Sequence, residues 1–243
     1  MKGFIVPLFV GVFAAATLAA GGATPAPVAQ AGTGTIKGHV RLSGKLPGNS
    51  VIRMGVDPKC GQMNQGKQVV NEVVKATADG SLGNVFVSLE GKFPKTPIPT
   101  TPVTINQSSC IYSPRVTGMV LGQTLQIKNS DNLLHNVHSK SDRDNNFNLA
   151  QAKAGVVDNY KPKNEEVMMR LGCEVHRWMV AYIGVVTNPY FATSDASGNF
   201  TITQVPPGTY TIDAWHERFG PVKKTVTVTA GGAATVDFTY TGA

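Results

Sequence analysis

The chain has 243 residues, of which 42% are hydrophobic and only 15% are charged, with 22 basic residues against 15 acidic ones. Such a low charged fraction argues against a charge-rich disordered chain and against a coiled coil. Three cysteines are too few for a disulfide scaffold, and in an exported protein an odd number leaves one thiol with a different role.

The first residues are typical of a secretory signal peptide. A basic start is followed by a nearly unbroken apolar run from Gly3 to Ala20, and then by small residues and prolines as far as Ala31. We predict a signal peptide over residues 1–31, cleaved after Ala31 or after Ala23. An uncleaved membrane anchor is the alternative that the length of the run allows. The protein is therefore expected in the periplasm or outside the cell.

Along the rest of the chain, apolar and polar residues alternate with a period of two, and turn residues separate the runs. No segment of useful length has the apolar spacing of an amphipathic helix. Many short strands with regular turns predict an all-β fold, a sandwich or a barrel. The expected strands centre on residues 36–42, 85–89, 125–127, 167–171, 210–212, 226–228 and 236–238.

Two parts of the chain differ in composition. The part from about Val103 to Pro189 contains two of the three cysteines, three of the five histidines and four of the seven methionines, whereas the part after it has no cysteine or methionine. We therefore predict a segment of N-terminal strands at 32–92, a second domain at 93–189 and a C-terminal β domain at 190–243.

One loop of the second domain gathers side chains that bind soft metals. Cys173, His176 and Met179 lie within seven residues, between two expected strands, and His135 and His138 stand at the start of another strand. A thiolate and two imidazoles in a plane, with a weak axial thioether, form the type 1 or blue copper site. Because thioether sulfur is a poor zinc ligand, the methionine favours copper over zinc.

These motifs resemble those of the cupredoxins. The spacing C-x2-H-x2-M is that of the amicyanin-like ligand loop, and the sequence H-N-V-H at residues 135–138 is similar to the upstream ligand strand of that group and of the plastocyanins. The resemblance covers about residues 103–186. It implies a Greek-key β-sandwich that carries single electrons on one copper ion, with the ligands His135, Cys173, His176 and, in the axial position, Met179.

The resemblance also implies the roles of two neighbouring features. Asn136 would hydrogen-bond across to the cysteine loop and stiffen the site, and the edge of His176 would be exposed to a redox partner. Arg177 departs from the amicyanin-like pattern, which has proline there, so the apolar partner surface usual in the family is in doubt.

Other readings of the same residues stay open. Cys173 could be a buried structural thiol, and Met179 could fill a gap in the core. His135 could merely cap a strand, with His138 as the true ligand, although the two histidines are expected on opposite faces. His39 and His216 are interpreted as structural, while the cluster Trp215-His216-Glu217 leaves a metal role open.

The expected role of the remaining two cysteines depends on the copper assignment. With Cys173 bound to copper, Cys60 and Cys110 form the natural disulfide in an oxidising compartment. Two free thiols are the alternative.

The C-terminal strands resemble the carboxypeptidase regulatory-like, transthyretin-like β-sandwich. The motif D-x-x-G-x-F-x-I starts at Asp195, and V-P-P-G-x-Y starts at Val205. The first half of that family is similar to residues 34–40, so a single sandwich could be built from 34–92 and 190–243 with the copper domain inserted between them. Such a combination is similar to a group of bacterial exported proteins that share the sequences at residues 147–151 and 214–217.

The leading functional hypothesis is an exported one-electron carrier that works with a redox protein such as a cytochrome. A non-redox copper-binding or carrier protein, or an envelope adhesion module based on the β-sandwich, is the alternative. An enzyme is not expected, because the sequence has no His-x-His pairs of multicopper enzymes, no haem attachment motif and no nucleophile elbow. Scattered basic residues and export argue against nucleic acid. The net charge of +7, or +6 after cleavage behind Ala31, permits an acidic partner or an anionic envelope surface.

Overall fold

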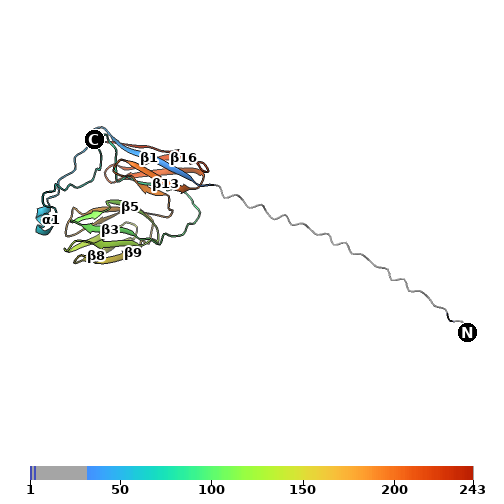
Figure 1. The fold of residues 1–243 in the computed structure, drawn as a ribbon, viewed down its shortest axis with the longest axis horizontal. Coiled ribbons are helices and arrows are strands. Elements are labelled where there is room, and N and C mark those ends of the chain that lie inside the picture. The colour runs from blue at the N-terminus through green and yellow to red at the C-terminus, as the bar shows by residue number, and fades with distance from the viewer. Residues whose placement is uncertain (2, 4–31, 243) are drawn as a thin grey trace. The chain divides into compact units, whose positions relative to one another are not determined.

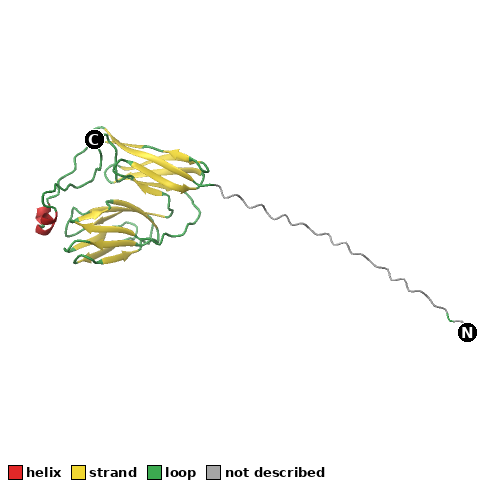
Figure 2. Ribbon diagram, in the orientation of Figure 1, coloured by secondary structure: helices red, strands yellow, loops and turns green. Residues whose placement is uncertain are grey.

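The computed structural model describes Met1, Gly3 and residues 32–242 (Figure 1). The predicted signal peptide, apart from Met1 and Gly3, lies outside these residues. Within the described part of the chain, no helix is long and apolar enough to cross a membrane. Almost all regular structure is β-strand, as Figure 2 shows, and the predicted all-β fold class is confirmed.

Strands from residues 34–90 and from residues 191–241 form one β-sandwich, called here the flanking sandwich. One sheet has the order β13-β1-β16, with β17 also paired to β1, and the other has the order β12-β2-β14-β15. Alternation explains the packing, since Ile36 and Val40 of β1 are buried while Lys37 is exposed. The strands are β1 (Gly34–Ser43), β2 (Phe86–Glu90), β12 (Phe191–Thr193), β13 (Asn199–Val205), β14 (Gly208–His216), β15 (Gly220–Val228), β16 (Ala233–Thr235) and β17 (Phe238–Thr241).

The chain between β2 and β12 forms a second sandwich, called here the central sandwich. Its sheets have the orders β4-β3-β6-β9 and β5-β11-β10-β7-β8, and they enclose a core of their own. We propose that each sandwich is a domain, with the predicted boundaries changed only for a segment between β1 and β2 that is described below. The strands are β3 (Val103–Ser108), β4 (Ile111–Ser113), β5 (Val116–Val120), β6 (Leu125–Asn129), β7 (His135–Ser139), β8 (Phe147–Gln151), β9 (Val157–Tyr160), β10 (Glu166–Gly172) and β11 (Val180–Val186).

One segment between β1 and β2 leaves the flanking sandwich, which differs from the hypothesis of a single sandwich built from 34–92 and 190–243. This segment, called here the strap (residues 52–63), contains the 3-10 helix η1 (Met54–Val56) and the helix α1 (Pro58–Met63). Met54 and Cys60 are buried in the core of the central sandwich, and a disulfide joins Cys60 to Cys110. The predicted disulfide is therefore present, and it fixes the strap to the central sandwich.

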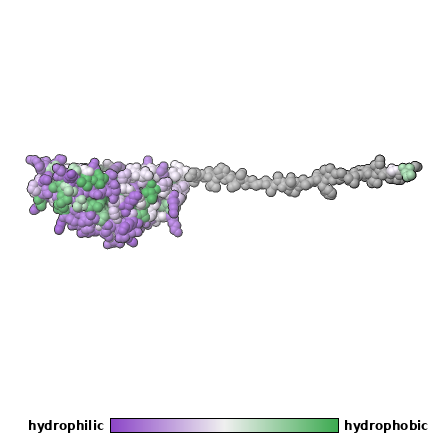
Figure 3. Space-filling view, turned by 90° about the horizontal axis from the view of Figure 1, so that it is seen from below, coloured by the Kyte–Doolittle hydropathy of each residue, from purple (hydrophilic) through white to green (hydrophobic). Residues whose placement is uncertain are grey.

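The surface is largely polar on the face seen in Figure 3, with small apolar patches between hydrophilic residues. Large apolar side chains that are exposed, such as Val51, Ile98 and Val175, come from different parts of the chain. Scattered exposure of this kind is normal for a folded protein and does not by itself mark an interface.

His216 is buried in the flanking sandwich, with its ring stacked on Phe219 at 4.7 Å between centroids. Its Nδ1 accepts a hydrogen bond from the backbone N–H of Arg218, and Nε2 has no partner among the described residues. Burial, helped by the nearby charges of Arg115 and Arg218, lowers the pKa of His216 to about 4. The structure thus places His216 in the core, away from the three converging donors described below.

This buried histidine predicts an acid-sensitive stability. Between pH 6.5 and 4 the unfolded chain takes up a proton on His216 that the folded chain does not, so the free energy of unfolding falls as the pH falls, by up to about 3 kcal/mol. His216→Asn, which keeps an acceptor near Nδ1, should flatten this part of the profile in denaturant titrations at several pH values. An unchanged slope in the variant would show that other groups cause the acid sensitivity.

Candidate metal centre

Three donor atoms of buried side chains converge inside the central sandwich. Nδ1 of His135 lies 3.0 Å from Nδ1 of His176, and a ring nitrogen of each histidine lies within 4.8 Å of Sγ of Cys173. The three side chains are 0%, 2% and 5% exposed. One thiolate and two imidazole nitrogens that face a common point fit a single copper ion.

The backbone fixes these donors in place. His135 is the first residue of β7, and the other two donor residues, Cys173 and His176, lie on the loop that joins β10 to β11. Within this loop, the N–H of Cys173 donates to the carbonyl of Met179 at 3.2 Å, and the N–H of Met179 donates to the carbonyl of His176 at 2.9 Å. The N–H of His176 lies 3.3 Å from Sγ of Cys173. A loop closed in this way holds its side chains before any metal arrives.

Met179, the predicted axial ligand, is 1% exposed and belongs to the same core cluster as Cys173. Its backbone bonds to Cys173 and His176 keep it beside both of them. A buried methionine whose backbone is bonded to the loop of Cys173 and His176 is compatible with the axial role that the type 1 copper hypothesis gives to this position.

Each histidine is oriented by a carboxylate that the sequence analysis did not identify. Nε2 of His135 lies 2.9 Å from Oδ2 of Asp131, and Nε2 of His176 lies 3.1 Å from Oδ2 of Asp57. A carboxylate on the distal nitrogen fixes the tautomer with a free Nδ1 and makes the ring a stronger metal ligand. Both Nδ1 atoms are thereby turned towards the cysteine sulfur.

Asp131 is held by the tight turn between β3 and β4. The two residues of that turn, Ser109 and Cys110, have φ values of 54° and 58°, which are unfavourable for residues other than glycine. Their N–H groups donate to the two oxygens of Asp131 at 2.7 and 2.8 Å. The same carboxylate therefore stabilises the turn and orients His135. In the sequence, the only indication of this role is that Asp131 lies four residues before His135.

Asp57 is the N-cap of α1. Its Oδ1 accepts hydrogen bonds from the N–H groups of Lys59 and Cys60, and Pro58 occupies the first turn, as is usual at a helix start. Its other oxygen is then free to reach His176. The Asp-Pro pair signals a helix start in the sequence, but nothing local predicts the contact with a histidine 119 residues away.

The expectation that His176 is exposed to a partner is wrong. The strap covers its edge: Asp57 binds Nε2, and the disulfide sulfurs of Cys60 and Cys110 lie within 4.8 Å of a ring nitrogen. On another side, the ring of Trp178 lies 5.2 Å from that of His176, and its Nε1 donates to the carbonyl of Cys110. The expectation failed because the strap reaches the central sandwich from a distant part of the chain.

The other predicted site residues have separate places. Oδ1 of Asn136 accepts a hydrogen bond from the N–H of Glu174 at 2.8 Å and lies 3.3 Å from Sγ of Cys173, so this side chain spans from β7 to the ligand loop. His138, the alternative ligand, is partly exposed, and its Nδ1 lies 2.6 Å from Oε1 of Glu174. Among the described residues, His135 and not His138 joins the group with Cys173 and His176.

The electrostatics of the centre favour a thiolate beside a positive charge. Burial raises the pKa of Cys173, but the hydrogen bond with His135 and those from backbone N–H groups outweigh burial and hold it below its usual value. Burial lowers the pKa of His135, yet Asp131 and Cys173 together raise it to about 9. The site stabilises a cation next to a thiolate, and a bound metal ion would replace the proton on the imidazole.

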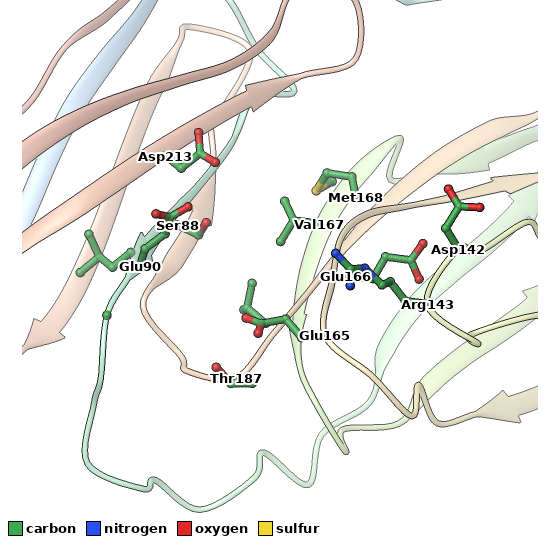
Figure 4. A pocket seen from close by; sticks show the side chains of 13 residues that line it. Ser88, Glu90, Asp142, Arg143, Glu165, Glu166, Val167, Met168, Thr187 and Asp213 are labelled. Atoms are coloured by element: carbon green, nitrogen blue, oxygen red, sulfur yellow. The ribbon is translucent and has the colours of Figure 1, made fainter.

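Two further groups of donors do not compete with this centre. Both groups contain Cys110, and one of them also contains Cys60. The sulfurs of these two cysteines are bonded to each other, so neither is a thiolate. A wider cleft of about 770 Å³ is lined by carboxylates that include Glu90, Glu165 and Asp213 (Figure 4). No three metal-binding atoms of its described residues converge as those of the candidate centre do.

The two carboxylates give a testable prediction. Asp131→Asn and Asp57→Asn should each weaken copper binding about 10- to 100-fold, because the imidazoles lose a charged hydrogen-bond acceptor and become poorer ligands. Chelator competition measures the affinity, and the reduction potential should rise because negative charge near the metal is lost. Asp142→Asn, an exposed carboxylate of the same sandwich, serves as the control. If all three variants bind copper with the same affinity, Asp131 and Asp57 do not have the roles assigned to them.

Comparison with known protein families gives a match for the C-terminal part of the chain. Residues 181–241 match the carboxypeptidase regulatory-like domain, a region that runs from β11 to β17. No curated protein sequence matches the chain. The C-terminal resemblance is thus confirmed for that region, whereas its combination with a copper domain stays a proposal.

Solved structures with similarity to this chain include several cupredoxins. A purple cupredoxin from Nitrosopumilus maritimus is 21% identical, with a TM-score of 0.30, over 34% of this chain and 98% of its own. A mutant of amicyanin with Cu(I) is 14% identical, with a TM-score of 0.32, over 41% of this chain and 97% of its own. A copper-containing nitrite reductase from Thermus scotoductus SA-01 is 16% identical, with a TM-score of 0.34, over 39% of this chain and 24% of its own. Similarity at this level does not extend to function, which depends here on the geometry of the site alone.

Proposed function

We propose that the protein is an exported type 1 copper protein that carries single electrons between redox partners. At least one of these partners is a redox protein such as a cytochrome. The observation that carries the proposal is the convergence of Nδ1 of His135, Nδ1 of His176 and Sγ of Cys173 in a buried site. Bound copper would supply a one-electron couple between Cu(II) and Cu(I). No catalytic step on a substrate is needed for this role.

The protein's own residues prepare the site for that couple. Asp57 and Asp131 hold the two imidazoles, and Asn136 ties the loop of Cys173 to β7. Burial of all three donors excludes water, which would otherwise add ligands and rearrange between oxidation states. A site whose donors are fixed before metal binding changes little in geometry when an electron is exchanged.

Spectroscopy of the copper-loaded protein tests the proposal. Addition of one equivalent of Cu(II) should give intense blue thiolate-to-copper absorption and a narrow hyperfine splitting in electron paramagnetic resonance. Mixing with a reduced soluble c-type cytochrome should bleach the colour rapidly. A colourless copper complex would favour the copper-carrier or adhesion hypothesis instead, and slow bleaching of a blue protein would place its electron donor elsewhere.

A further inference from the structure

A recess of about 310 Å³ opens directly over the cysteine of the candidate centre. Cys173 itself lines it, together with its neighbours Gly172 and Glu174. The cysteine is the only one of the three converging donors that lines this recess. The recess is therefore the place where a molecule on the surface comes nearest to the thiolate.

The rim of the recess is strongly basic. Lys140, Arg170 and Arg177 are exposed and line it, together with the partly exposed His138. Glu174 is its only carboxylate, and it already pairs with His138 at 2.6 Å and with Lys140 at 3.6 Å. Within the described chain, neither arginine has a carboxylate within 4.0 Å. Two guanidinium groups without a carboxylate partner thus stand beside the candidate centre.

Gly172 leaves room for the side chain of Arg170. A Cβ at this position would lie 3.2 Å from Nη1 of Arg170, so the glycine lets the guanidinium lie close to the backbone next to Cys173. Arg177 approaches from the other end of the ligand loop, where the amicyanin-like pattern has proline. The two charges that face the recess are thus placed by two separate features of the sequence.

The approach over His176 is closed. The strap and Trp178 cover His176, as described above, and the strap is fixed by the disulfide. A partner that must come close to the centre therefore meets the recess and its cations. The exposed side chain of Val175, on the same loop, adds an apolar contact beside them.

We propose that this basic recess docks the carboxylate-rich surface of an acidic redox protein. The inference rests on the proposed electron-carrier function and adds the partner's chemistry and the docking residues. Charge complementarity speeds encounter between proteins and makes it sensitive to salt. A protein is favoured over a small anion because the cations stand on an open rim with Val175 beside them, rather than around an enclosed cavity.

The test measures binding and electron transfer with an acidic b-type cytochrome as the probe. For Arg170→Glu/Arg177→Glu, we expect the dissociation constant from calorimetry to rise at least about 10-fold at low ionic strength. The reduction rate should fall in parallel, and for the unmodified protein both affinity and rate should decline with added salt. Binding is also measured without copper, so that one readout does not depend on the loaded centre.

Lys37→Glu/Lys45→Glu is the matched control, since it makes the same change in net charge at exposed positions of β1 and the loop that follows. If both double variants weaken binding equally, or neither does, the docking site is wrong while a blue, redox-active protein still supports the proposed function. If the recess variant loses binding only to phosphatidylglycerol vesicles, the recess binds lipid and the inference is overturned. A protein that forms no blue copper site refutes the proposed function, and this inference with it.

Discussion

Cys173→Ser should abolish the blue absorption and weaken the binding of Cu(I) by at least about 100-fold. Loss of an outer carboxylate alone costs 10- to 100-fold in comparable metal sites, and the thiolate is a direct donor with the strongest preference for Cu(I). The change removes one sulfur atom from a buried position and keeps a side chain of similar size. Absorption spectra and competition with a Cu(I) chelator measure both effects.

Two histidine variants test which histidine binds copper together with Cys173. His135→Asn should reproduce the loss of colour, whereas His138→Asn should leave the absorption unchanged, because His138 lies against Glu174 outside the group of donors. Retained colour in Cys173→Ser, or loss of colour in His138→Asn, would show that the ligand set is wrong.

Removal of the disulfide should lower the free energy of unfolding by about 4 kcal/mol. The bond closes a loop with a sequence separation of 50, and the loss of chain entropy in the unfolded state accounts for a stabilisation of that size. It also fixes the strap, whose Asp57 orients His176. Cys60→Ala/Cys110→Ala should therefore destabilise the fold and increase hydrogen exchange at residues 52–63.

Reduced protein with both cysteines intact separates the two possible causes. It loses the cross-link but keeps the sulfur atoms in the core, so it should show most of the destabilisation seen in the alanine variant. If the reduced protein is as stable as the oxidised one, packing of the two side chains and not the cross-link holds the strap.

Much of the fold follows from local patterns in the sequence. Period-two alternation marks most of the longer strands, and turn residues such as Ser197-Gly198-Asn199 lie close to their ends. The loop from Cys173 to Met179 could be recognised because its donors are close in sequence, and a loop of seven residues between two strands leaves them little freedom to separate.

The missing parts of the site come from contacts between distant residues. Asp57 reaches His176 only because the strap crosses to the central sandwich, and no periodicity or motif encodes that crossing. The closed edge of His176 follows from the same crossing. Residue type and spacing can indicate a donor set, but which edge of it faces solvent depends on segments far away in the chain.

Reversible redox titration of the copper-loaded protein tests the central claim most directly. One electron per chain should bleach the blue absorption completely at a single midpoint potential, and reoxidation should restore it without loss of copper. Copper release on reduction, or a colour change that requires more or less than one electron per chain, would contradict the assignment of His135, Cys173 and His176 to an electron-carrying copper site.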